Sequence, residues 1–124
     1  MVSENVLAKI PSKDLAVHVV WTPVLGSDNE QEAIQADHLF PDRRATFYWD
    51  GAQDLGLSYG RTIELPRGRQ LAWDIYFVYG PDVEWQEAVP LPTEWNHQLG
   101  DDDRLLGDGS KLRTAIENLL MEMK

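Results

Sequence analysis

Two stretches of the chain consist almost entirely of apolar residues, many of them β-branched or aromatic. Residues 15–21 read Leu-Ala-Val-His-Val-Val-Trp, and residues 73–79 read Trp-Asp-Ile-Tyr-Phe-Val-Tyr. Such short, nearly continuous runs are typical of strands that are buried on both faces, in sheets that helices cover on both sides. Residues 45–49, Ala-Thr-Phe-Tyr-Trp, predict a third and shorter strand.

The second long apolar run is followed by residues that favour a turn. Gly80-Pro81-Asp82 is such a cluster, and the sequence continues with Val83-Glu84-Trp85. The simplest interpretation is a hairpin in which residues 83–85 pair with residues 73–79. Residues 86–109 then form a long connection that precedes the last helix.

Four segments combine a helix-capping residue with apolar residues at helical spacing, which predicts four helices. These segments are residues 3–10, 27–40, 50–60 and 110–123. The pairs Ser27 with Glu30 and Asp50 with Gln53 have the spacing of a capping box. Gly60 is expected to end the third helix, because glycine readily adopts the left-handed conformation found just after many helices.

The composition is that of an ordinary globular domain. The chain has 124 residues, of which 43% are hydrophobic and 26% charged, so we expect one domain over residues 1–124. No apolar run is long enough to cross a membrane. Residues 1–4 lack the basic and apolar regions of a secretory signal. We therefore expect a cytoplasmic protein without a membrane partner.

The net charge of −10 narrows the class of partner. Nucleic acids and anionic membrane surfaces attract proteins through lysine and arginine, so neither is an expected partner of this acidic chain. The charge fits a soluble protein or a cationic partner.

Several short motifs resemble the second half of the thioredoxin-like family, in its redoxin branch. In that family a strand like residues 18–21 precedes a loop with an acidic residue and a helix. A segment like Trp49-Asp50-Gly51 then begins a helix that ends like Ser58-Tyr59-Gly60, and a long strand ends in a turn like Tyr79-Gly80-Pro81-Asp82. The resemblance implies an α/β, thioredoxin-like but incomplete fold: a mixed sheet of three to four strands flanked by helices.

The chain departs from that family in three ways. The family's first strand and the cysteine-containing turn after it would lie before residue 1. Redox members place a cis-proline where this chain has Gln70-Leu71-Ala72, and the chain contains no cysteine. Thiol–disulfide exchange requires a thiolate, so this chain alone is not expected to perform it. A fold does not by itself imply a function.

Tryptophans are frequent and fall near the ends of predicted elements. Trp21 and Trp49 end the first two strands, where open α/β sheets bind ligands, and Trp95 lies in the late connection. We expect an aromatic cleft for a small molecule or a peptide at one end of the sheet. Its predicted ligand-binding residues are Trp21, Pro23, Trp49, Asp50, Trp95, Asn96 and His97. The alternative is that these rings fill the core.

These observations favour a binding or interaction module over an enzyme. One alternative is a cofactor-independent enzyme that uses His97, Asp50 or Asp74 in an aromatic pocket. Against it, Asp50 has the position of a helix cap and Asp74 that of an outward-facing or ion-paired strand residue. Another alternative is the cysteine-free part of a split redox protein. No cofactor or metal is expected, because the chain has no glycine-rich phosphate loop and no His-Glu-x-x-His motif.

The resemblance also bears on the oligomeric state. The family's first strand lies between the strands that correspond here to residues 15–21 and 73–79. Without that neighbour, both strands need other partners for their backbone groups, and unpaired strand edges favour association. We therefore predict a homodimer, with direct pairing of the two strands in a smaller monomeric sheet as the alternative.

Overall fold

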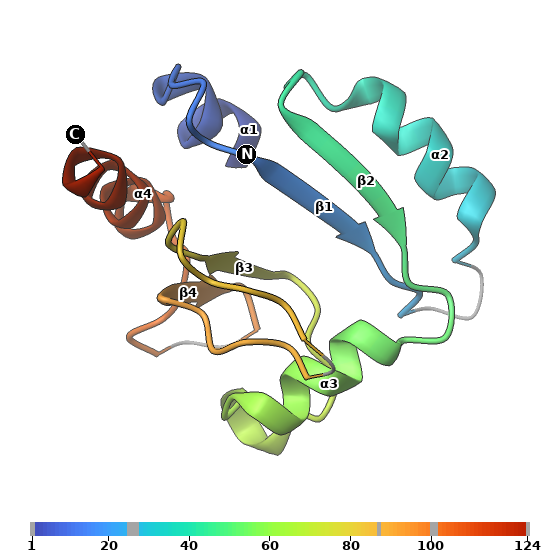
Figure 1. Ribbon diagram of the computed structural model, residues 1–124. Helices are drawn as coiled ribbons and strands as arrows, with labels where there is room; N and C mark the ends of the chain where they lie inside the picture. Colours follow the sequence, from blue (N-terminus) through green and yellow to red (C-terminus); the bar gives the residue numbers. More distant parts are fainter. Residues whose placement is uncertain (1, 25–27, 87, 100–101, 124) are drawn as a thin grey trace.

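The computed structural model is an α/β protein, and it describes residues 2–24, 28–86, 88–99 and 102–123 (Figure 1). In chain order its elements are α1 (Val2–Asn5), the 3-10 turn η1 (Leu7–Lys9), β1 (Val17–Trp21), α2 (Glu30–Leu39), β2 (Ala45–Trp49), α3 (Asp54–Thr62), the 3-10 turn η2 (Pro66–Gly68), β3 (Ile75–Val78), β4 (Glu94–His97) and α4 (Ser110–Glu122).

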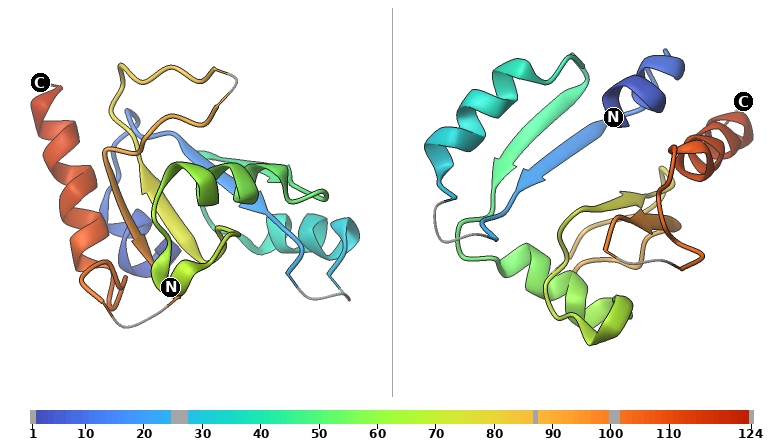
Figure 2. Two further views of the ribbon diagram at one scale, coloured as in Figure 1. Left: turned by 90° about the horizontal axis from the view of Figure 1, so that it is seen from below. Right: turned by 180° about the vertical axis from the view of Figure 1, so that it is seen from behind.

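The four strands form two separate sheets. β1 pairs with β2 in parallel, and β3 pairs with β4 antiparallel. In space the strands follow the order β2, β1, β3, β4, so that β1 and β3 are the inner neighbours (Figures 1 and 2). No hydrogen-bonded ladder joins β1 to β3 in the described part of the chain. The expected single mixed sheet is therefore wrong, because no described strand bridges these two inner edges.

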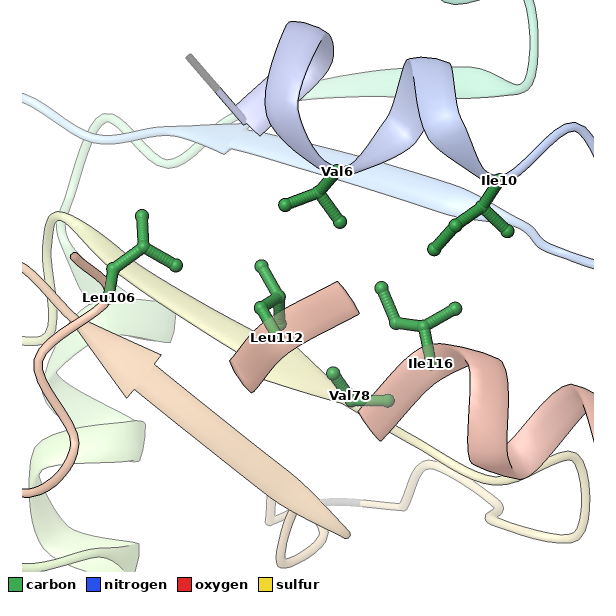
Figure 3. Close-up of a cluster of buried hydrophobic side chains, with 6 residues drawn as sticks. All are labelled: Val6, Ile10, Val78, Leu106, Leu112 and Ile116. Atoms are coloured by element: carbon green, nitrogen blue, oxygen red, sulfur yellow. The ribbon is translucent and has the colours of Figure 1, made fainter. Parts of the chain in front are cut away.

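Two buried apolar clusters lie on opposite sides of β3. The first joins the N-terminal turns to α4, and its members are Val6, Ile10, Val78, Leu106, Leu112 and Ile116 (Figure 3). The second packs α3 and the segment after it against β4, and its buried members are Tyr59, Leu65, Ala72, Val89 and Trp95. The helices α3 and α4 accordingly flank the β3–β4 pair from different sides (Figure 2).

β1 is covered on one face only, which corrects the prediction of burial on both faces. Its residues alternate between half-buried and exposed, and Val20 is 36% exposed. α2 packs on the face that carries Trp21 and Phe47, where the Phe40 ring meets the Phe47 ring edge-on. The other face includes Val20 and Tyr48, and Tyr48 is 45% exposed.

The predicted hairpin partner of β3 is also wrong. Residues 83–85 form no strand, and β4 pairs with β3 instead, in the segment expected to be a connection. The reason is burial: Trp95, Asn96 and His97 of β4 are all buried, whereas Trp85 stays 54% exposed. Pairing through β4 therefore removes more side chains from water.

Several predicted helix boundaries differ from those observed. The segment expected as one helix over residues 3–10 divides into α1 and η1, α2 begins at Glu30, and α3 begins at Asp54. α3 runs past Gly60 to Thr62, so Gly60 does not end the helix. A Cβ atom at residue 60 would overlap the backbone of Gln70, so the close packing there requires glycine. The Asn29 side chain caps α2 by accepting a hydrogen bond from the Glu32 amide. The predicted capping residue Ser27 lies outside the described residues.

Candidate functional site

The predicted site residues at the carboxyl ends of β1 and β2 do lie together. Trp21 and Trp49 are register partners, and the Trp21 indole Nε1 donates to Asp37 Oδ1 at 2.6 Å. They border a shallow depression of about 130 Å³ between α2 and the sheet. Pro23 follows directly, and its carbonyl oxygen accepts a hydrogen bond from Gln53 Nε2 at 2.6 Å. This depression is too small for most metabolites.

Asp50 is engaged with the start of α3. Its Oδ2 accepts hydrogen bonds from the backbone amides of Leu55 and Gly56, at 3.0 and 3.2 Å. A carboxylate at this position satisfies amides that the first helical turn leaves unpaired and complements the helix dipole. The capping interpretation of Asp50 thus agrees with the structure, although the helix begins four residues later, at Asp54.

The other predicted site residues lie on β4, in the second sheet. His97 has no solvent exposure, and both of its ring nitrogens are hydrogen-bonded. Its Nδ1 accepts from the Leu99 amide at 3.0 Å, so Nδ1 carries no proton. Its Nε2 lies 2.9 Å from Asp102 Oδ1 and is therefore the donor of that bond. In this conformation neither nitrogen is available to take a proton from a substrate.

Arg104, which the sequence analysis did not single out, organises the outer side of β4. Its guanidinium lies 4.4 Å above the centre of the Trp95 ring and donates to Glu94 Oε1 at 2.9 Å and to the Trp95 carbonyl at 3.1 Å. The Arg104 carbonyl accepts from Asn96 Nδ2 at 3.3 Å. Asn96 is 3% exposed, and its Oδ1 has no hydrogen-bond partner among the described residues.

A broad polar depression of about 670 Å³ opens between β4, the segment around Asp103 and α4. Carboxylates, cationic groups, hydroxyls and amides all line it, including those of Glu94, Asn96, Arg104 and Lys111. The Arg104 guanidinium is paired with Glu94, and Lys111 Nζ donates to the Asp103 backbone carbonyl at 2.8 Å.

The predicted site residues therefore fall into two groups in two sheets. Trp21, Trp49 and Asp50 belong to the β1–β2 end, whereas Asn96 and His97 belong to β4. Asp74, the remaining candidate catalytic acid, is exposed and directly precedes β3. It adopts the left-handed conformation, with φ of 49°, and its carbonyl accepts from the Gln98 amide.

An aromatic cluster covers β3 on the α3 side. The rings of Tyr59 and Phe77 stack at 3.9 Å, and Trp85 packs edge-on against Tyr59. The hydroxyls of Tyr59 and Tyr79 are hydrogen-bonded at 2.6 Å. Burial, together with this hydrogen bond, raises the pKa of Tyr59 far above its ordinary value, so the phenol stays protonated. These side chains pack against one another as part of the protein core and do not form a reactive site.

The most unusual feature is the pair of inner strand edges. The carbonyl of Trp21 accepts from the Asp50 amide on the β2 side, so the backbone groups of His18 and Val20 point the other way, toward β3. The carbonyls of Asp74 and Val78 bond to the β4 side, so those of Ile75 and Phe77 point toward β1. We call these the two open edges.

No group of three or more histidine, cysteine, aspartate or glutamate side chains in the described part of the chain is arranged to hold a metal ion. Within the same residues, no helix has the length and apolar character needed to cross a membrane.

Comparison with known proteins gives no relative for this chain: no family model, no curated protein and no solved structure matches it significantly. The thioredoxin-like resemblance therefore stays a prediction that rests on the short sequence motifs.

Proposed function

We propose that this chain is a non-redox, thioredoxin-like binding module that accepts a strand of another polypeptide between β1 and β3. The observation that carries the proposal is that each sheet has an unpaired inner edge and that these two edges face each other. An added strand would hydrogen-bond to both edges and unite the two sheets. Strand addition of this kind is a common mode of peptide recognition.

The chemistry of the open edges supports an extended peptide as the ligand. His18, Val20, Ile75 and Phe77 each present one N–H and one C=O that neither sheet uses. An unsatisfied backbone group costs about 1–3 kcal/mol when it is buried. A strand that covers the half-buried residues Ile75 and Phe77 would at the same time supply the partners that their backbone groups then need. A small molecule cannot match such a repeating row of donors and acceptors, whereas a peptide backbone does.

A second copy of this chain, as in the predicted homodimer, is the alternative partner. An inner edge that faces another strand of its own molecule is hard for a folded second copy to reach, because the incoming sheet would bring its own helices. The outer edge of β2 is more accessible for pairing across a two-fold axis, whereas the outer edge of β4 is already bonded at His97 to Arg104 and Leu106. Self-association through the β2 edge would leave the inner edges unpaired.

The cysteine-free half of a split redox protein is a special case of the same proposal. The partner strand would then be followed by the turn that carries the thiols. Thiol–disulfide exchange activity that appears only in the complex would identify this case.

Amide hydrogen exchange of the whole chain, with and without a lysine-flanked apolar peptide as the probe, tests the proposal. We expect new protection at both open edges, including the amides of Val20 and Phe77. Protection at one edge alone, or at neither, would contradict strand insertion. Light scattering over a range of concentrations of the chain alone separates self-association from peptide binding.

A further inference from the structure

The inner edge of β3 lies between two covered faces. Along β3 the side chains alternate: Tyr76 and Val78 pack in the cluster formed with α1 and α4, whereas Ile75 and Phe77 pack in the cluster formed with α3. A strand added next to β3 continues both faces. On the β3 side, its side chains would therefore alternate between the same two apolar clusters.

The neighbouring strand β1 presents Val20 and His18 on its uncovered face. Val20 is exposed there, beside Tyr48, whose hydroxyl lies 2.9 Å from His18 Nδ1. An incoming strand places its own side chains next to these in the sheet, where apolar and aromatic neighbours stabilise cross-strand pairs. Polar side chains on the added strand would lose water without gaining partners.

The charge of the protein bears on the residues that flank the strand. The net charge is −10, and Asp74 stands exposed at the beginning of β3. The negative electrostatic potential of such a protein attracts basic segments and speeds their association.

From these observations, which rest on the proposed function, we infer that the partner presents four or five consecutive apolar residues, without proline and flanked by lysine or arginine. The length follows from β1 and β3, which have five and four residues. This differs from peptides that add to an exposed sheet edge, where apolar and polar residues alternate because one face stays in water.

A panel of peptides with identical lysine flanks tests the inference by fluorescence anisotropy and amide exchange. The first has five residues of valine, isoleucine and leucine; the second alternates these with serine; the third carries proline at the centre. We expect the first to bind saturably and protect both open edges. The second should bind at least about tenfold more weakly, since buried hydroxyls lack partners, and the third should not protect the edges.

The outcomes distinguish this inference from the proposed function. Equal binding of the first two peptides, with both edges protected, would overturn the all-apolar pattern and leave strand insertion intact. If no peptide protects the edges, strand insertion itself is wrong. Replacing the flanks by glutamate should weaken binding of the first peptide and slow its association; an unchanged rate and affinity would overturn the basic flanks.

Variants of the chain provide a matched control. Val20→Lys places a charge beside the added strand, and Ile34→Lys places one on α2; both positions are exposed, at 36% and 49%. Val20→Lys should weaken binding of the first peptide at least about fivefold, on the scale of one lost interface contact. Ile34→Lys should not change it. Equal effects of the two variants would overturn the assignment of the peptide to the β1 edge.

Discussion

Arg44, which directly precedes β2, is hydrogen-bonded to backbone carbonyls of the N-terminal segment. Its Nη1 donates to the carbonyls of Ile10 and Ser12, at 2.6 and 3.0 Å, and its Nη2 donates to that of Leu7 at 3.0 Å. The Asp42 carboxylate holds the same guanidinium from the other side, with the closest contact at 2.7 Å. Lysine cannot reproduce this planar fork of donors.

Arg44→Lys should therefore lower the free energy of unfolding by about 1–3 kcal/mol, because several carbonyls and the Asp42 carboxylate lose donors. Urea denaturation followed by circular dichroism measures the change. Arg43→Lys is the matched control, since the adjacent arginine is exposed and should tolerate lysine. Equal effects at both positions would contradict a specific role for Arg44.

The same contact predicts a pH dependence. The hydrogen bond from Arg44 is the main cause that lowers the pKa of the Asp42 carboxyl, and burial partly opposes it. A lowered pKa in the folded state stabilises the fold above the ordinary value of about 3.9, and this contribution is lost as the pH falls below it. Asp42→Asn should reduce the loss of stability below about pH 4, measured by urea denaturation. Asp82→Asn, at an exposed turn residue, is the control for the substitution itself.

His97 should be found as a single neutral tautomer. The Leu99 amide donates to Nδ1, so the proton resides on Nε2 and is donated to Asp102. Nitrogen NMR of the imidazole should show an unprotonated Nδ1 and a protonated Nε2 near neutral pH. Asp102→Asn should keep this assignment, because the Leu99 bond is untouched. A proton on Nδ1 would contradict the geometry described for β4.

At the scale of elements, α3 depends on a glycine inside the helix. Alanine normally stabilises a helix by about 1 kcal/mol relative to glycine. At Gly60, however, the added Cβ would overlap the Gln70 backbone, which cannot move like a flexible side chain. Gly60→Ala should therefore destabilise the protein, by about 1–3 kcal/mol as for other overpacked sites.

Gly80→Ala is the matched control for this prediction, because a Cβ there would meet its nearest neighbour, Thr93 Oγ1, at an ordinary 3.9 Å. Thermal unfolding of the two variants gives the comparison. A stable Gly60→Ala variant would show that α3 and the segment after it do not pack as described.

The elements that the sequence predicts well are those whose signal is local. The bounds expected for residues 45–49 agree with β2, and the apolar stripe of residues 110–123 agrees with α4. β4 carried no such signal, because Asn96 and His97 are polar and become buried only through bonds to Arg104 and Asp102. Residues 83–85 have the composition of a strand and nevertheless form none.

In the candidate site, too, only the features with a local sequence signal could be predicted. The proximity of Trp21 and Trp49 follows from two strands that end together, which the apolar pattern predicts. His97 lies in a different sheet because β4, rather than residues 83–85, pairs with β3. Which segment pairs depends on how many side chains become buried in the folded protein, and the local sequence does not reveal this. The open edges were foreseeable only through the family resemblance, since no single residue marks an unpaired strand.

At the scale of the whole molecule, the two sheets differ in how much apolar surface they bury. β3 contributes to both clusters, with Val78 as a buried member of the first and Ile75 and Phe77 packed, partly buried, against the second. Neither cluster includes a residue from β1, β2 or α2. Among the described residues of those three elements, Ala33 is the sole buried apolar side chain. Regions with few buried contacts open more readily than the rest of a protein.

Native-state hydrogen exchange should therefore show that amides of β1, β2 and α2 open at a lower free energy than amides of β3 and α4. We expect a difference of about 1.5–3 kcal/mol, the scale of one fully buried aliphatic side chain. Binding of the apolar, lysine-flanked peptide should narrow this difference, because the added strand couples β1 to β3. Exchange of both regions in one cooperative step without peptide would contradict the division, since it would require β1 and β3 to be coupled already.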